Sequence, residues 1–346
     1  MFHIDPVLHK ERNCMVVSRA ATGIYLVLSR HCKVGDRVAV PANLCYAGIL
    51  PAQYAGLKLC FFDVDARSGN ATMDSFSVVA DLGVKAAIIP HMYGQPVMDM
   101  PMIAEMCKKR GILLIEDCAS AMGAEADYPI GRMGDYTVYS TGYSKTMDLG
   151  CGGLLCSDLP MSGLEDKEKE LPEMSNDAGK NMALFSKIYR LLRNCGEGTA
   201  LERSIYRGIP EPLKSGLICS LPEGEKQRIW ARLKDLPDIV DRRRKMLKEY
   251  KWCLRGHEEV FYPFSEGAVP WRFSLLVSCE KRKRIIDAML NQDLPVSDWY
   301  PRVTPIFLDD GEYPGAEWHE KHVLNFPLLL EQEKVEEICE VLRALL

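Results

Sequence analysis

One lysine, Lys145, lies between hydroxyl residues and a group of glycines in residues 139–153, which read YSTGYSKTMDLGCGG. The nearest charged residues along the chain are Asp135 behind it and Asp148 ahead of it, and residues typical of strands flank both sides. A surface lysine ordinarily has charged neighbours on a helix. This setting therefore predicts a partly buried, activated amine.

A second candidate, Asp117, follows the apolar run of the segment LLIEDCAS. An acid at the end of a buried strand loses hydration unless a positive group meets it. On its own Asp117 is also suited to cap a helix, because small residues follow it. Together with Lys145 it supplies what pyridoxal phosphate requires, namely a lysine for the Schiff base and a carboxylate that faces the ring nitrogen.

The same hypothesis assigns proton transfer and phosphate binding to particular residues. A carboxylate beside the pyridine nitrogen keeps that nitrogen protonated, and a lysine amine released from the cofactor can move a proton. The phosphate needs hydroxyl and backbone N–H groups near the start of a helix. Ser140 and the turn at residues 20–23, including Ala21 and Thr22, are the candidates for this role.

Short β-rich runs alternate with helical stretches over residues 17–158. The alternation predicts a mainly parallel sheet with helices on both faces, and ligands of such sheets bind at the carboxyl ends of the strands. The predicted strands are Arg37–Val40, Lys58–Asp63, Ala86–Pro90, Ile112–Glu116, Thr137–Thr141 and Gly153–Cys156, and the predicted helices are Ala20–Arg30, Tyr46–Tyr54, Ser75–Leu82 and Asp99–Arg110.

We expect a large α/β domain over residues 1–214 and a smaller α+β domain over residues 215–346. Residues 159–180 are polar and charged, and they read as a mobile connection within the large domain. The second region is expected to contain one long helix that Pro237 kinks, followed by a strand and two helices. These last three are Trp271–Val277, Glu280–Asn291 and Glu331–Leu345.

Composition and charge indicate an ordinary globular protein. The formal net charge of −5 gives no reason to expect nucleic acid or an anionic membrane as partner. The thirteen cysteines include no C-x-x-C pair, and several occupy apolar runs, as reduced buried cysteines do. Examples are Cys60, Cys118, Cys156 and Cys339. With no signal peptide or membrane span in the sequence, we expect a cytoplasmic location.

An ordered set of motifs resembles the DegT/StrS (DegT/DnrJ/EryC1/StrS) family of sugar aminotransferases, which are fold type I pyridoxal phosphate enzymes. The set begins with a small-residue turn and ends with S-x-x-x-x-K and GCGG, and the resemblance covers residues from about Ser18 to the C-terminus. The motifs between are VGDRVAVP (34–41), FFDVD (61–65), KAAIIPHMYGQP (85–96) and IEDCASAMGA (115–124), with a long helix carrying paired arginines (225–250) and LNFPL (324–328) later in the chain. The resemblance implies a seven-stranded sheet in the large domain.

By position, the resemblance implies that Lys145 forms the Schiff base, Asp117 faces the ring nitrogen and Ser140 binds the phosphate. Lys145 also argues against the dehydratase members, in which histidine takes that place. Several positions depart from the family pattern. Ser120 replaces a glutamine that contacts the ring hydroxyl, Cys45 with Tyr46 beside it replaces an aromatic that covers the ring, Cys151 replaces a glutamate, and Ala20, Ala21 and Thr22 replace a Gly-Thr pair.

Five further residues are candidates for substrate contacts, each with packing or structural hydrogen bonding as the alternative reading. They are His91, Tyr143, Asn194, Tyr300 and Arg302. The resemblance implies that a loop near Asn194 completes the site of a partner subunit, and hence a homodimer. No metal site is expected.

The predicted function is transfer of an amino group from a donor, glutamate by resemblance, to a keto-sugar that is nucleotide-linked. The alternatives that remain open are a pyridoxal phosphate lyase or dehydratase, an aminotransferase for a non-sugar ketone, and a catalytically silent family member. A dinucleotide-binding oxidoreductase is disfavoured, because GCGG lacks the G-x-G-x-x-G spacing and does not begin a helix.

Overall fold

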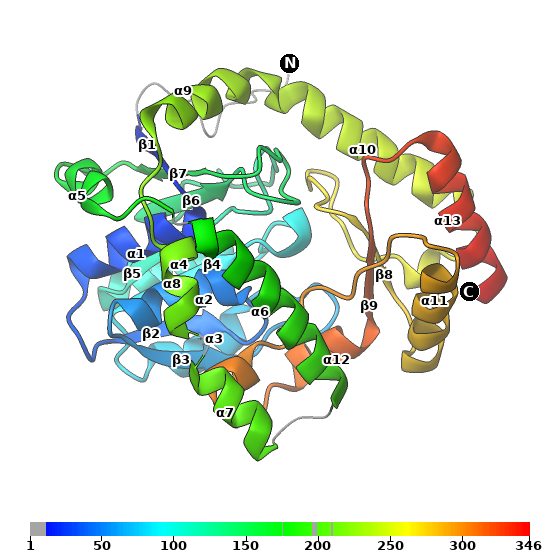
Figure 1. Ribbon diagram of the computed structural model, residues 1–346, viewed down its shortest axis with the longest axis horizontal. Helices are drawn as coiled ribbons and strands as arrows, with labels where there is room; N and C mark the ends of the chain where they lie inside the picture. Colours follow the sequence, from blue (N-terminus) through cyan, green and yellow to red (C-terminus); the bar gives the residue numbers. More distant parts are fainter. Residues whose placement is uncertain (1–11, 175, 196–198, 209) are drawn as a thin grey trace.

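A seven-stranded sheet organises the first half of the chain (Figure 1), and this computed structural model describes residues 12–174, 176–195, 199–208 and 210–346. The strand order is β1-β7-β6-β5-β4-β2-β3. Strands β2 to β6 are parallel to one another, whereas β7 runs antiparallel to both β6 and β1. The strands are β1 (Asn13–Val17), β2 (Arg37–Pro41), β3 (Lys58–Phe62), β4 (Ala86–Pro90), β5 (Leu113–Asp117), β6 (Tyr136–Ser140) and β7 (Gly153–Ser157). The predicted α/β class with a mainly parallel seven-stranded sheet is confirmed.

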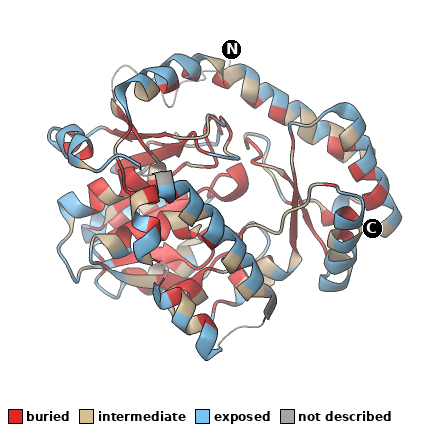
Figure 2. Cartoon of the chain, viewed as in Figure 1, coloured by how far each residue is buried: buried red, intermediate tan, exposed pale blue. Residues whose placement is uncertain are grey.

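Helices cover both faces of this sheet because successive strand side chains point to opposite sides. Val38 and Val40 of β2 pack towards α1, α2, α6 and α8, whereas Ala39 between them packs towards α3 and α4. Figure 2 shows the buried residues gathered on the strands and on the helix faces that meet them. The helices are α1 (Ala20–His31), α2 (Tyr46–Tyr54), α3 (Met73–Ala80), α4 (Met100–Arg110), α5 (Leu164–Glu170), α6 (Asn176–Cys195), α7 (Ala200–Gly208) and α8 (Pro210–Leu217).

A smaller unit with its own core follows. Strands β8 (Phe273–Leu276) and β9 (Val323–Phe326) pair antiparallel, apart from the large sheet (Figure 1). Tyr250 stacks on Phe273 with ring centroids 4.5 Å apart. Both rings lie in an apolar cluster to which the two strands and three helices contribute side chains. These are α10 (Leu236–Cys253), α11 (Cys279–Asn291) and α13 (Gln332–Leu345); α12 (Pro314–His322) precedes β9.

The long helix expected after residue 223 is divided. Helix α9 (Glu223–Arg232) is followed by a 3-10 turn at residues 233–235 and then by α10, with Pro237 in its first turn. Proline is tolerated there because first-turn N–H groups lack helical partners in any case. Helix α9 and the start of α10 pack on the large sheet, and the end of α10 packs on the small unit. The boundary at 214/215 stays a prediction, and these cores favour a division within α10.

Three expectations are corrected by the structure. Strand β1 was not expected, and its Cys14 lies opposite Cys156 of β7, with which it forms a disulfide. Cys156 is therefore not the reduced cysteine that its apolar run suggested. The connection at residues 159–180 contains helix α5, where the buried Glu168 accepts a hydrogen bond from the Leu221 N–H at 3.0 Å and pairs with Lys226.

Among the described residues, no helix is both long and apolar enough to cross a membrane.

Candidate active site

The expected site residues meet at the carboxyl ends of the parallel strands. Asp117 is the last residue of β5, and Ser140 is the last residue of β6. Lys145 follows in the loop that leads from β6 to β7, and Ser120 follows β5. The topology alone therefore brings these four residues to one edge of the sheet.

The Lys145 amine is half-buried between the two structural units. Its Nζ donates to Ser120 Oγ at 3.3 Å and to the Tyr300 hydroxyl at 3.5 Å. Burial lowers the pKa of this amine, but Tyr300, Cys45 and Asp117 outweigh burial, so that the pKa is raised. The prediction of a partly buried amine matches the structure, whereas its activation stays a prediction.

Asp117 provides a negative group one strand from β6. Its side chain is 7% exposed, and Oδ1 accepts the Ala119 N–H at 2.8 Å. Burial raises the pKa of this carboxyl, although the Ala119 N–H, Lys145 and His91 act in the opposite direction. A protonated ring nitrogen would supply the positive charge that the buried carboxylate lacks, and the residue therefore fits the pyridinium of pyridoxal phosphate.

The start of α1 and the end of β6 offer groups for a phosphate. The Ser140 hydroxyl accepts the Gly142 N–H at 3.3 Å. Helix α1 has no side-chain cap and no acid in its first turn, so its first N–H groups remain available to an anion. Gly153 lies against this helix start: a Cβ there would come within 2.9 Å of the Ala20 nitrogen. Backbone groups at Ala20 and Ala21 and the Ser140 hydroxyl fit a phosphate.

The structure directs the side chains of two predicted cofactor ligands away from the site. Thr22 is 0% exposed, and its hydroxyl hydrogen-bonds to the Leu217 carbonyl at 2.9 Å and to the Ser18 hydroxyl at 2.7 Å. The Tyr46 ring packs edge-on against Phe185 of α6 at 4.7 Å, and burial raises the pKa of its hydroxyl. Both side chains point into the core between the helices and away from a cofactor, whereas the Thr22 N–H belongs to the first turn of α1 and stays a candidate for the phosphate.

His91 is a structural residue rather than a substrate contact. The Val97 N–H donates to its Nδ1 at 3.0 Å, so its Nε2 carries the proton that is directed at Glu116 Oε1, 2.9 Å away. The Glu116 carboxylate also accepts backbone N–H groups of the loop at residues 131–134. Cys118 lies close enough to complete a metal-ligand set, but these hydrogen bonds already occupy the His91 and Glu116 ligand atoms.

The other four substrate candidates have four different outcomes. Tyr300 lies in the site, through its contact with Lys145. Tyr143 is 77% exposed and points outward. Arg302 Nη1 lies 3.8 Å from Glu317 Oε1 of α12, which is a structural contact. Asn194 belongs to α6, but its side chain lies outside the described part of the chain.

A chain of hydrogen bonds behind Tyr300 did not emerge from the sequence. The Tyr300 N–H donates to the Tyr93 hydroxyl at 2.8 Å, and this hydroxyl is 3.0 Å from His319 Nε2. His319 Nδ1 is 2.9 Å from the Ala66 carbonyl, so Nδ1 carries the proton and Nε2 accepts from Tyr93. Burial lowers the pKa of His319 to about 4, which keeps this ring neutral at neutral pH. The chain fixes the position of Tyr300.

Arg243 was expected only as one of a pair of helix arginines, but it links the two halves of the site. Its guanidinium donates to the Lys145 carbonyl at 2.9 Å and the Thr146 carbonyl at 3.1 Å, and also to the Trp271 carbonyl at 2.9 Å. The only signal for it in the sequence is the run of arginines at residues 242–244, which also fits a solvated face.

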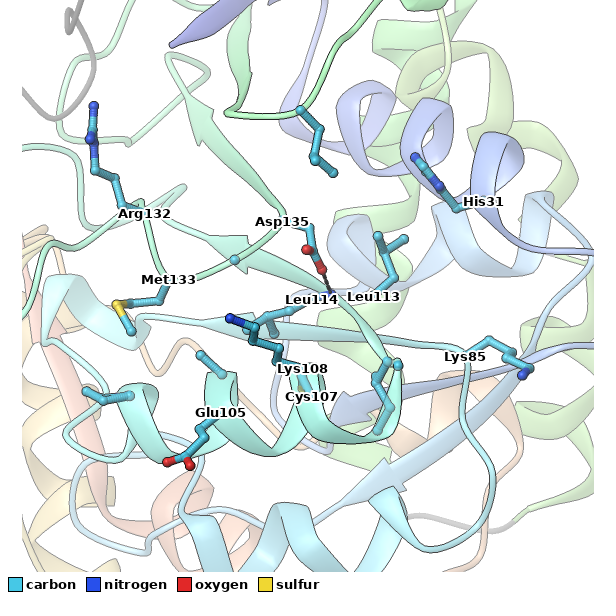
Figure 3. A pocket seen from close by; sticks show the side chains of 16 residues that line it. His31, Lys85, Glu105, Cys107, Lys108, Leu113, Leu114, Arg132, Met133 and Asp135 are labelled. Carbon is cyan, nitrogen blue, oxygen red and sulfur yellow. Dashed lines mark hydrogen bonds between the residues drawn. The ribbon is translucent and has the colours of Figure 1, made fainter. Parts of the chain in front are cut away.

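A cavity of about 860 Å³ lies elsewhere, at the amino ends of β4, β5 and β6 (Figure 3). Lys85, Lys108 and Asp135 are among the residues that line it, and Asp135 Oδ2 accepts the Leu114 N–H at 2.8 Å. This is the opposite edge of the sheet from Lys145, and the cavity is not part of the candidate active site.

Known proteins resemble this chain over nearly its whole length. A Saccharopolyspora spinosa dTDP-4-dehydro-2,3,6-trideoxy-D-glucose 4-aminotransferase is 25% identical over 301 residues, which cover 85% of this chain and 73% of the relative. An Escherichia coli O157:H7 GDP-perosamine synthase is 26% identical over 345 residues, covering 94% and 83%. The crystal structure of an aminotransferase from Streptoalloteichus hindustanus shares the fold, with a TM-score of 0.71 at 24% identity, over 96% of this chain and 85% of that one.

Residues 7–343 match the DegT/DnrJ/EryC1/StrS aminotransferase family. The match spans both structural units and includes Asp117, Ser140 and Lys145. The chain therefore belongs to the DegT/DnrJ/EryC1/StrS aminotransferase family.

Proposed function

We propose that this protein uses pyridoxal phosphate to move an amino group from an amino-acid donor, L-glutamate in the first instance, to the ketone of a nucleotide-linked sugar. The observation that carries the proposal is the position of Lys145. Its amine is half-buried against Ser120 and Tyr300, beside the strand that ends at the buried Asp117.

Each residue of the site has a part in holding the cofactor. Lys145 Nζ would hold it covalently, and the Asp117 carboxylate would face its ring nitrogen. Ser140 Oγ and the first N–H groups of α1 would bind its phosphate, and Ser120 Oγ would contact its ring hydroxyl. When bound, pyridoxal phosphate supplies a sink for the electrons released at the substrate carbon.

The relatives support a sugar as the acceptor. One of them is named as an aminotransferase for a dTDP-linked sugar, and another is named as a GDP-perosamine synthase. A third, 24% identical over 323 residues that cover 84% of this chain and 74% of the relative, is a GDP-4-keto-6-deoxy-D-mannose 3-dehydratase from Yersinia pseudotuberculosis. The dehydratase members of the family resemblance have histidine at this position. Lysine at position 145 therefore favours amino transfer.

The test is spectroscopic and uses the purified protein with Lys145→Ala as control. We expect an absorbance band of bound pyridoxal phosphate that L-glutamate abolishes, and whose covalent link to the wild-type chain borohydride fixes as an added mass. In Lys145→Ala that added mass should be absent. A covalent adduct that persists in the variant would overturn the assignment of Lys145.

The acceptor is tested in the same samples. A panel of dTDP-, GDP- and UDP-linked keto-sugars is added after glutamate, and mass spectrometry detects incorporation of ¹⁵N from the labelled donor. Water loss without nitrogen incorporation would indicate a dehydratase instead. Nitrogen transfer only to a cyclic non-sugar ketone would support the transaminase activity and would refute a sugar as the acceptor.

We also propose a homodimer in which the partner covers the loop around Lys145. Tyr143 supports this proposal, because a large aromatic ring 77% exposed two residues from the reactive lysine is suited to burial at an interface. Light scattering should give twice the chain mass. Tyr143→Glu should shift that mass towards the monomer.

A cytoplasmic location is the third part of the proposal. Buried thiols such as Cys107 and Cys118 support it, because burial raises the pKa of each thiol and keeps it unreactive. The Cys14–Cys156 pair is the exception. Alkylation mass spectrometry on protein taken directly from cells should find the other cysteines reduced. A second bridged pair would count against the cytoplasm.

A further inference from the structure

Arg272 carries a half-buried guanidinium beside the candidate active site. Its guanidinium carbon lies 4.5 Å from the centroid of the Trp271 ring, over the face of that ring. The Trp271 ring in turn lies 5.1 Å from the ring of Tyr300, whose hydroxyl contacts the Lys145 amine. Arg272 is thus one aromatic ring removed from the side chain that touches Lys145.

The backbone beside Arg272 is tied to the loop that holds Lys145. The Trp271 N–H donates to the Tyr93 carbonyl at 2.8 Å, and the Trp271 indole N–H donates to the Ser144 carbonyl. Arg243 adds a third link by bonding the Trp271 and Lys145 carbonyls together. Trp271, on which the Arg272 guanidinium stacks, is therefore held at a fixed place relative to the Lys145 loop.

This guanidinium has no anionic partner in the described part of the chain. No carboxylate oxygen of the described residues lies within 4.0 Å of it, and none of those residues accepts a hydrogen bond from it. Burial lowers the pKa of Arg272, and only Tyr300 acts in the opposite direction. Several other partly buried arginines pair with acids, whereas the buried Arg243 is satisfied by backbone carbonyls. The paired ones are Arg12 with Asp158, Arg193 with Asp298 and Glu320, Arg244 with Glu125, and Arg282 with Asp298.

An unpaired, partly desolvated cation costs free energy unless an anion from outside meets it. Stacking on Trp271 occupies a face of the planar guanidinium, and it leaves the N–H groups free in the plane of the group. A planar fork of N–H donors matches the oxygens of a carboxylate or a phosphate. The arrangement is thus suited to binding an oxyanion.

We propose that Arg272 is a specificity-determining residue that binds an oxyanion of a substrate whose reacting carbon lies at Lys145. The identity of that substrate rests on the proposed function. Two sources share the required chemistry, namely a carboxylate of the amino-acid donor and the diphosphate of the nucleotide-linked acceptor. Each would be anchored by its charged end while its amine or ketone faces the Lys145 amine.

The test measures equilibrium binding of two unreactive probes by calorimetry. Glutarate carries the two carboxylates of the donor without its amine, and dTDP or GDP carries the diphosphate without the sugar. We expect Arg272→Gln to weaken the binding of one probe at least tenfold, because a hydrogen-bonded charge is lost. The affected probe identifies the source of the oxyanion.

The chain offers a matched control in Arg255, whose guanidinium also stacks on a tryptophan, Trp252, at 4.5 Å. Trp252 is 69% exposed and lies at the end of α10, in the small unit. Arg255→Gln should leave both probes bound as in the wild type. Arg272→Lys keeps the charge without the planar fork, and it should bind the affected probe with intermediate affinity.

Unchanged affinities in a folded Arg272→Gln protein, or a wild type that binds neither probe, would overturn the proposal. Circular dichroism and the melting temperature establish that the variant is folded. The proposed function fails separately: if no amine reaches any acceptor while Arg272 still governs probe binding, the oxyanion site stands and the transferase does not. If Arg272→Gln still transfers the amine and its saturation constants for donor and acceptor are unaltered, the transferase stands and the oxyanion site does not.

Discussion

Replacing Asp117 with asparagine should stabilise the protein without cofactor and weaken its binding of cofactor. The carboxylate is 7% exposed, and burial raises its pKa. The charged form is therefore disfavoured in the folded chain, despite the nearby Lys145. Asparagine has nearly the same shape and retains an oxygen for the Ala119 N–H, which donates to Oδ1 at 2.8 Å. The substitution thus removes the charge and little else.

The two effects have opposite signs and separable sizes. Relief of a buried, incompletely paired charge is expected to raise the free energy of unfolding by about 1–3 kcal/mol, which corresponds to a rise in melting temperature of roughly 2–10 °C. Loss of one member of a buried charge pair with the ring nitrogen costs about 2–5 kcal/mol. The Kd for pyridoxal phosphate should therefore rise roughly 30-fold to several thousand-fold.

The dependence on pH gives an independent check of the cause. An acid whose pKa is raised on folding binds its proton more tightly in the folded state, so its contribution to stability falls as pH rises from the ordinary value of 3.8 through the raised value. Asp117→Asn lacks this term. Calorimetric melting of the two cofactor-free proteins between pH 4 and 8 should show the gap in their free energies of unfolding widen through that window and then level off.

A suitable control is Asp135→Asn at the opposite edge of the sheet. Asp135 also accepts one backbone N–H, from Leu114 at 2.8 Å, but its side chain is exposed. Its replacement should give no gain in stability and no change in cofactor affinity. The reasoning would be refuted if Asp117→Asn melted below the wild type at pH 7 without cofactor, or if it bound pyridoxal phosphate as tightly as the wild type does.

Three further substitutions test the contacts around the site. Tyr300→Phe removes the hydroxyl 3.5 Å from Lys145 Nζ and should slow the glutamate half-reaction roughly tenfold or more with an unchanged melting temperature; an unchanged rate would remove Tyr300 from the site. Arg243→Gln removes two hydrogen bonds to carbonyls of the Lys145 loop and should lower the melting temperature and slow borohydride-trapped cofactor attachment together, whereas a loss of stability alone would make it merely structural. Gly153→Ala places a Cβ too close to the Tyr139 carbonyl oxygen of β6 and 2.9 Å from the Ala20 nitrogen, so the start of β7 must shift from both; it should lower the melting temperature and weaken the inhibition by phosphate of pyridoxal phosphate binding, and inhibition equal to that of the wild type would separate the start of α1 from the phosphate.

The strands were predictable where both faces are buried. Ala86–Pro90 is a continuous apolar run, and it forms β4 with the expected bounds. Strand β1 was missed because Asn13–Val17 is short and comes directly before a helix, so that its pairing with β7 depends on a partner about 140 residues away. The disulfide at Cys14 was missed for the same reason. A sequence shows which runs are apolar, but it does not show which strand becomes a neighbour.

Site residues were predictable where strand order alone decided their position. Asp117, Ser120 and Lys145 end up together because parallel strands present their carboxyl ends at one edge. The side-chain orientations of Thr22 and Tyr46 were not predictable, because the choice between the helix face that meets the site and the face that meets the core depends on packing against α6 and α8. Arg272 carried no signal, because its role depends on the absence of a partner.

The links between the two structural units make the geometry of the site a property of their interface. Asp117 and Ser140 belong to the sheet, whereas Trp271 and Tyr300 belong to the small unit. Tyr93, in the 3-10 turn (Met92–Gly94) that follows β4, holds both of the latter by accepting hydrogen bonds from the Trp271 and Tyr300 N–H groups. A small movement of one unit would therefore change the distance between the carboxylate that faces the cofactor and the groups that meet the substrate, while leaving each set intact. Tyr93→Phe keeps its backbone carbonyl and loses only the hydroxyl, so it should alter substrate saturation constants more than cofactor affinity. The reverse pattern would mean that the small unit does not position the substrate.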